Sequence, residues 1–219
     1  MTFMNKLRQS IFQWIVFFVG IMVLSYGVVL TIVANLGVSP WDVFHIGLAN
    51  VTPISTGMAV IITGGVIVAI VCYYLKSLPQ IGTLINMLFI GIFIDIFLRL
   101  PITPVVNGIF EQFLVLILGT FLFGFGAGLY ISSKIGAGPR DGLVLLLHVK
   151  KGWSISIVRT IMELSALIVG VILGGPIGIG TIIISFAIGP IMEFSIKFWD
   201  RLIGKYIKIT GSNGVLDPP

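Results

Sequence analysis

Long runs of apolar residues organise the chain, and short stretches rich in glycine, proline and charge separate them. A hydrocarbon core of about 30 Å is crossed by about 20 helical residues, because a helix rises about 1.5 Å per residue. Six runs meet that length: residues 11–36, 55–75, 81–100, 110–133, 154–173 and 176–198. The pattern therefore predicts an all-α membrane protein with six transmembrane helices in a single membrane domain, residues 1–219.

Composition supports lipid as the main solvent. Hydrophobic residues make up 57% of the 219 residues and charged residues only 10%, too few to cover a water-soluble globule. A single cysteine and two separated histidines, His45 and His148, give no cluster with the spacing of a metal site. No HExxH or Walker motif occurs in the sequence. We therefore expect no enzyme activity, no catalytic or metal residue, no cofactor and no nucleic-acid partner.

The basic residues indicate the orientation of the chain in the membrane. If the N-terminus is cytoplasmic, eleven of the thirteen Lys and Arg residues fall on the cytoplasmic side of the predicted spans. Arg99 falls outside and Arg159 lies within a span. An excess of Lys and Arg in cytoplasmic loops is the usual topology signal of helical membrane proteins. It predicts that both termini are cytoplasmic, including a tail over residues 200–219.

The two halves of the chain carry the same ordered positions. A shift of 99 residues gives seven identities within residues 20–42, and a shift of 98 realigns Ile81-Gly82-Thr83 with Ile179-Gly180-Thr181. The seven pairs are Gly20/Gly119, Gly27/Gly126, Leu30/Leu129, Ile32/Ile131, Gly37/Gly136, Pro40/Pro139 and Asp42/Asp141. Residues 10–100 and 109–199 are thus predicted to be two repeats of three spans each.

An odd number of spans per repeat inserts the second repeat upside down relative to the first. Inverted repeats of this kind recur in secondary transporters, where a site lies between the halves. The leading hypothesis is therefore a membrane transporter of a small solute or ion. The alternative is a non-transporting membrane scaffold or accessory subunit. The expected partners are the lipid bilayer and the small solute or ion, and a homo-oligomer is left open.

Each repeat has a short element between its first two spans. It reads Gly37-Val38-Ser39-Pro40-Trp41-Asp42 in the first repeat and Gly136-Ala137-Gly138-Pro139-Arg140-Asp141 in the second. One interpretation is a well-formed helix start, because proline suits the first helical position and aspartate complements the positive helix end. The other is a pair of re-entrant half-helices, residues 42–50 and 141–149, whose N-termini or carboxylates bind a solute or ion.

The two copies of this element differ where Trp41 of the first is replaced by Arg140 of the second. Arg140 suits binding of a carboxylate or phosphate, or marks the cytoplasmic membrane surface. Trp41 stacks on a solute or anchors the chain at the interface. His45, one turn later, is either a proton relay or a hydrogen-bonded structural side chain. With Ser39 and the two repeated aspartates, these residues are the candidate substrate-binding set at the loops.

A second candidate region lies inside the fifth predicted span. Arg159 and Glu163 are four residues apart, so they share one helix face and can form an ion pair. Counted from Ser154, Glu163 lies about 14 Å deep, near the bilayer midplane. Intramembrane charges cost several kcal/mol, so they serve either the function or a structural pair that joins the halves.

The third span of each repeat begins and ends with polar residues. Thr83 and Thr181 follow a glycine at its start and offer either hydroxyl ligands or helix caps. At its end an acid precedes a base by four residues, which is typical of helix-end ion pairs. These pairs are Asp95 with Arg99 and Glu193 with Lys197.

The repeated Gly-x-x-Pro-x-Asp element, with the two Ile-Gly-Thr copies, resembles the bacterial YitT/YczE-type membrane proteins. The resemblance covers the six spans, about residues 10 to 200. It rests on Gly37/Pro40/Asp42, on Gly136/Pro139/Asp141 and on residues 81–83 and 179–181. It implies a bacterial inner-membrane location and transfers neither a substrate nor a catalytic residue.

Overall fold

The computed structural model describes residues 3–76, 78–136 and 138–204, and these residues form helices and connecting loops without a strand. Six of the helices are long and apolar enough to cross a membrane, which confirms the predicted fold class. Two shorter helices follow the repeated loops, as expected. In chain order the helices are α1 (Phe3–Val33), α2 (Pro40–Val51), α3 (Thr56–Leu75), α4 (Ile81–Arg99), α5 (Ile109–Ser132), α6 (Pro139–Lys151), α7 (Ile155–Ile172) and α8 (Ile179–Ile203).

Two helix boundaries differ from the apolar runs for backbone reasons. Helix α1 ends at Val33, because Asn35 and Gly37 take positive φ angles of 54° and 100° that no α-helix contains. Helix α8 begins at Ile179, after an extended Gly178, and continues to Ile203. Residues 200–203 of the expected tail therefore belong to a helix, whereas residues 205–219 lie outside the described part of the chain.

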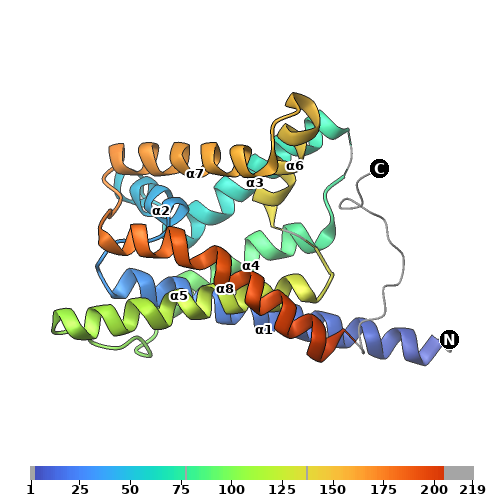
Figure 1. The fold of residues 1–219 in the computed structure, drawn as a ribbon, viewed down its shortest axis with the longest axis horizontal. Coiled ribbons are helices and arrows are strands. Elements are labelled where there is room, and N and C mark those ends of the chain that lie inside the picture. The colour runs from blue at the N-terminus through green and yellow to red at the C-terminus, as the bar shows by residue number, and fades with distance from the viewer. Residues whose placement is uncertain (1–2, 77, 137, 205–219) are drawn as a thin grey trace.

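The helices form two layers (Figure 1). One layer contains α1, α4, α5 and α8, with the α1–α5 pair at its centre. The other contains α2, α3, α6 and α7, and in it α2 packs on α7 while α6 packs on α3. Each short helix therefore rests mainly against a long helix of the opposite half. In Figure 1, α2 and α6 lie towards opposite ends of this second layer.

Contacts between the halves recur at the repeat spacing. A Cβ at Gly27 would collide with the backbone of Phe123, and a Cβ at Gly126 would collide with that of Leu24. Residues 24 and 123, like Gly27 and Gly126, are 99 positions apart. These glycines let the α1 and α5 backbones approach closely, which is how helices associate in lipid.

The contacts of the two repeated loops also recur at equivalent positions of the two halves. Gly37 lies against Thr181 at the start of α8, and Gly136 lies against Thr83 at the start of α4. The loop of each half is thus held by the third long helix of the other half. This exchange ties each repeated loop to the opposite half of the chain.

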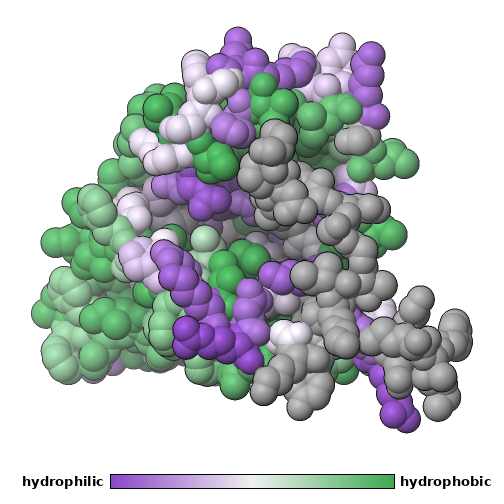
Figure 2. Space-filling model, turned by 45° about the vertical axis from the view of Figure 1, so that its right-hand side comes forward, coloured by the Kyte–Doolittle hydropathy of each residue, from purple (hydrophilic) through white to green (hydrophobic). Residues whose placement is uncertain are grey.

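The outer surface is apolar, as the sequence composition requires. Large side chains such as Ile172, Ile182 and Phe186 are more than half exposed. Figure 2 shows a left flank that is almost wholly hydrophobic, with hydrophilic residues gathered towards the top and centre of that view. Six apolar helices with such a surface imply contact with the lipid bilayer.

Candidate functional site between the two short helices

The first turns of α2 and α6 meet inside the molecule. Arg140 Cζ lies 4.4 Å from the centre of the Trp41 ring. A guanidinium at this distance from an indole face is attracted by the ring quadrupole. Because a bilayer core is about 30 Å thick, two residues in contact cannot mark its opposite surfaces. The contact therefore excludes the combined interpretation in which Trp41 and Arg140 mark opposite membrane surfaces.

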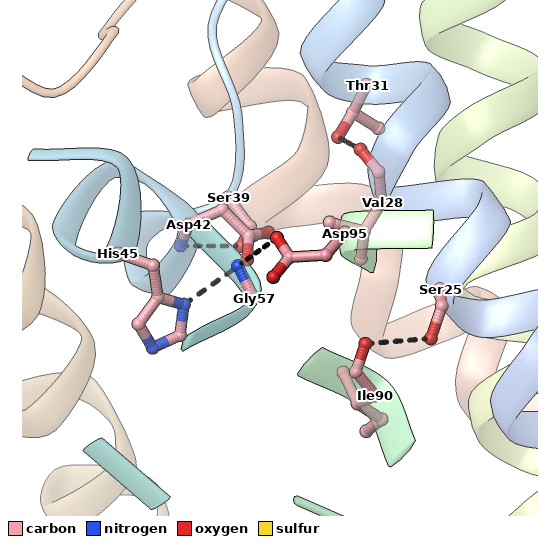
Figure 3. A network of polar contacts seen from close by, with 9 residues as sticks. All are labelled: Ser25, Val28, Thr31, Ser39, Asp42, His45, Gly57, Ile90 and Asp95. Carbon is pink, nitrogen blue, oxygen red and sulfur yellow. Dashed lines mark hydrogen bonds and ion pairs between the residues drawn. The ribbon is translucent and has the colours of Figure 1, made fainter. Parts of the chain in front are cut away.

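The start of α2 is held by its own side chains (Figure 3). Ser39 is the N-cap, and its Oγ accepts from the backbone N–H of Asp42 at 3.4 Å and donates to Asp42 Oδ2 at 2.5 Å. His45 Nδ1 stands 3.6 Å from Asp42 Oδ1. Ser39, Asp42 and His45 are all buried. Both interpretations of Asp42 remain open, since the carboxylate stabilises the helix start and also lies at its buried end.

The start of α6 is built differently because Gly138 replaces the serine. No side chain caps this helix, and Asp141 Oδ1 instead accepts from Arg159 Nη2 at 3.0 Å. The partner of Arg159 is therefore on α6, and the ion pair with Glu163 that helical spacing predicts is not formed in the described structure. The space beside Gly138 is bordered by Asn86 Oδ1, Tyr130 Oη and Asp141 Oδ2, each 3.6–3.7 Å from the position of an added Cβ.

A cavity of about 70 Å³ adjoins the Trp41–Arg140 contact. Water occupies about 30 Å³ per molecule in the liquid, so the cavity holds an ion or a group the size of about two waters. Glu163, near the middle of α7, lies on its wall. The lining residues are Ser39, Pro40, Trp41, Phe123, Arg140, Glu163, Ile184, Ser185 and Ile188.

Opposite charges are concentrated around this cavity. Arg140 is within electrostatic range of Asp42, Asp141 and Glu163. With Arg159, the cluster has three carboxylates and two guanidinium groups, a formal charge of −1 when His45 is neutral. Charges this close to the middle of a membrane protein are retained where they pair or bind a charged ligand.

The remaining predicted residues lie elsewhere. Thr181 is buried, its Oγ1 accepts from the Gly178 N–H at 3.3 Å, and it does not line the cavity. Thr83 lies at the Gly136 loop. Neither threonine is brought to the Trp41–Arg140 contact, so both pack the loops of the opposite half.

The two expected helix-end ion pairs have different outcomes. Lys197 Nζ donates to Glu193 Oε1 at 2.5 Å, as the spacing predicts. Asp95, in contrast, caps α3: its Oδ1 accepts from the Gly57 N–H at 2.9 Å (Figure 3), and its Oδ2 accepts from Ser55 Oγ. Asp95 therefore ties α4 to the start of α3 instead of pairing with Arg99.

Sequence reasoning missed several residues at the site. Phe123 and Ser185 line the cavity but sit in apolar spans without a distinguishing pattern. Asn86 had a usable signal, because a polar side chain in a membrane span is costly. It is buried, and its Nδ2 finds no hydrogen-bond partner in the described part of the chain.

Comparison with known proteins places these residues in a family. Residues 11–197 match a family described as a family of unknown function, DUF6198. The chain belongs to this family. The match contains both short helices and most or all of each long helix, so the whole cavity lies within the DUF6198 region.

Curated relatives support the same assignment. The chain is 40% identical over 190 residues to the uncharacterized membrane protein YczE of Bacillus subtilis, covering 86% of this chain and 87% of the relative. It is 31% identical over 183 residues to an uncharacterized protein of Haemophilus influenzae, covering 84% and 83%. The uncharacterized protein YyaS of Bacillus subtilis is 28% identical over 166 residues, covering 75% and 83%. No solved structure matches the chain. The expected resemblance to YczE-type membrane proteins is confirmed.

Proposed function

We propose that this DUF6198 protein transports a small solute or ion through a site at the Trp41–Arg140 contact. One observation carries the proposal: two helices from different halves begin at the same point, beside a cavity walled by Arg140 and Glu163. Helix N-termini and charged side chains that converge inside a membrane bundle are the usual elements of a transporter site.

The reciprocal contacts support the further proposal that the halves are inverted repeats. Equivalent residues touch each other only near a symmetry axis, and Trp41 and Arg140 are equivalent positions 99 residues apart. An axis in the membrane plane at this contact makes the site reachable from either side by rocking one half against the other. In this proposal the protein has no enzyme activity.

The proposal includes the membrane in which the protein lies and its orientation there. The chain lies in the bacterial inner membrane with both termini cytoplasmic, which keeps ten of the thirteen basic residues on the inner side. The count excludes Arg99 and Arg159, as before, and also Arg140, which lies inside the bundle. In that orientation α2 and α6 reach the site from opposite faces.

The test is solute-driven current in proteoliposomes adsorbed on a solid-supported membrane. Concentration jumps of small inorganic cations, amines, amino acids and carboxylates are applied to the unmodified protein, to Arg140→Gln and to Glu163→Gln. We expect at least one solute class to give a transient current that both variants abolish. Arg99→Gln and Glu193→Gln remove charges outside the cavity and should leave the current unchanged.

Folding is checked by monodisperse elution in detergent before each measurement. If the current persists in the folded Arg140→Gln and Glu163→Gln variants, the transported solute does not bind at this site. An absence of current for every solute class would favour the scaffold alternative.

A further inference from the structure

The two halves differ in how their second and third long helices pack. Helices α3 and α4 pack along each other, whereas the corresponding helices α7 and α8 barely touch. In the first half, a Cβ at Gly57 would collide with Gly91, which shows how closely the backbones approach. In the second half, the position of Gly91 is Gly189, and an added Cβ there meets nothing within 4 Å.

Two pairs of equivalent residues differ between the halves at the height of the cavity. Gly64 of α3 packs against the Met87 side chain of α4. The equivalent positions in the second half are Glu163 and Ser185, and both line the cavity. The position that is a closely packed glycine in the first half is thus a charged side chain on the cavity wall in the second.

An apolar groove of about 410 Å³ lies along this opening. Its walls are Leu167, Ile177, Gly178, Thr181, Ile182, Ser185 and Phe186. Ser185 also lines the cavity of about 70 Å³ that contains Arg140 and Glu163. Because Ile182 and Phe186 are mostly exposed on the apolar surface, the groove faces lipid, and it borders the charged cavity at Ser185.

The charges of the cavity favour one kind of ligand. Asp42 is held by Ser39, Asp141 is paired with Arg159, and each aspartate also lies in the first turn of its own short helix. Glu163 forms no hydrogen bond or ion pair with a described residue. Arg140 lies on the Trp41 ring and offsets one carboxylate, so the cluster keeps one carboxylate in excess, and a carboxylate binds an ammonium group well.

We propose that the groove and cavity together bind a single-chain lipophilic amine that arrives from the bilayer between α7 and α8. The alkyl chain lies along the groove, and the ammonium group lies at Glu163. A cavity the size of about two waters admits a primary ammonium group but not a phospholipid headgroup. This inference rests on the proposed function in taking the same cavity as the polar end of the site.

The test uses three photoreactive probes that differ only in their polar end: dodecylamine, dodecanoic acid and dodecanol, each with a diazirine at the chain terminus. Each probe is irradiated with the protein in liposomes, and the labelled residues are mapped by mass spectrometry. We expect the amine to label the groove residues of α7 and α8 about tenfold more than the alcohol, the scale of one charge-assisted hydrogen bond.

Two variants and one control sharpen this test. Glu163→Gln should reduce labelling by the amine to that by the alcohol. Ser185→Phe fills the junction of groove and cavity and should reduce labelling by the amine in the same way. Ser165→Phe is the matched control, because both serine hydroxyls donate to the carbonyl four residues earlier, at 2.7 Å, and Ser165 lines neither space.

Equal labelling of the groove by all three probes in the unmodified protein would show ordinary surrounding lipid and overturn the proposal. Preferential labelling by dodecanoic acid would overturn the choice of an ammonium ligand. If solute-driven current depends on Arg140 and Glu163 while the amine does not label the groove, transport stands and this inference fails. Labelling that depends on Glu163 without any current would leave the amine site standing and remove the transport proposal.

Discussion

The guanidinium of Arg140 lies over the Trp41 ring, with 4.4 Å between its Cζ and the ring centre. The two residues occupy the same position of the repeated loop, 99 residues apart. Their contact joins the starts of α2 and α6 and fixes the shape of the cavity beside them. Predictions about this contact therefore test the site and the packing of the two halves together.

The Trp41–Arg140 contact should contribute measurably to stability. We expect Trp41→Leu and Arg140→Gln each to destabilise the protein, with a coupling energy of about 1 kcal/mol in a double-mutant cycle, the scale of a partly desolvated cation–π contact. Unfolding by titration with denaturing detergent measures the free energies. Additive effects of the two substitutions would show that the contact contributes no stability of its own.

Arg159 should couple to Asp141 and not to Glu163. Removing either member of the Arg159–Asp141 pair alone leaves a charge without its partner, so the double variant Arg159→Gln/Asp141→Asn should lose less stability than the sum of the single variants. Both side chains are partly exposed, so we expect a coupling below about 1 kcal/mol. A second double-mutant cycle combines Arg159→Gln with Glu163→Gln for comparison. A larger coupling energy in that cycle would favour the Arg159–Glu163 pair predicted from helical spacing.

Asp95 should matter for stability more than its neighbour Arg99. Asp95→Asn weakens two hydrogen bonds that cap α3, at Ser55 and Gly57, and should cost about 1 kcal/mol, the typical value of a helix N-cap. Arg99→Gln should change the unfolding free energy little. Thermal unfolding of the two variants in the same detergent decides the matter. Equal destabilisation would restore the Asp95–Arg99 ion pair as the main role of the carboxylate.

The close glycine contacts between α1 and α5 should tolerate no added methyl group. Gly27→Ala and Gly126→Ala place a Cβ against the opposite backbone, and we expect similar losses of about 1–3 kcal/mol from overpacking. Gly189→Ala is the control, since nothing lies within 4 Å of its Cβ position. Detergent-induced unfolding measures all three, and a tolerated Gly27→Ala would mean that α1 and α5 can move apart without loss.

The stability of the protein should depend on Ser39 and tolerate a serine at the equivalent position, Gly138. Ser39→Ala removes the hydroxyl that bonds Asp42 and should cost about 1 kcal/mol. Gly138→Ser adds a hydroxyl beside Asp141 where the nearest atoms to its Cβ are 3.6 Å away, so we expect no loss of stability. Thermal unfolding compares the pair. A destabilising Gly138→Ser would show that the space beside Asn86 and Tyr130 must stay open.

The positions of the helices follow from local features of the amino-acid sequence. In lipid a backbone must satisfy its own hydrogen bonds, so each long apolar run becomes a helix whatever its neighbours are. The six spans and the two short helices after the Gly-x-x-Pro-x-Asp loops follow from these local rules. The loop residues Ser39, Trp41 and Arg140 were also identifiable, because they belong to a loop element that the sequence repeats.

The tertiary structure alone decided which side chains meet. Arg159 and Asp95 each have a near neighbour in sequence that suits an ion pair, yet both bind a residue of another helix. The cavity wall at Ser185 and the opening between α7 and α8 likewise depend on how closely whole helices approach. Helix formation is local, with bonds four residues apart, whereas these contacts depend on the packing of the complete bundle, which no short sequence pattern encodes.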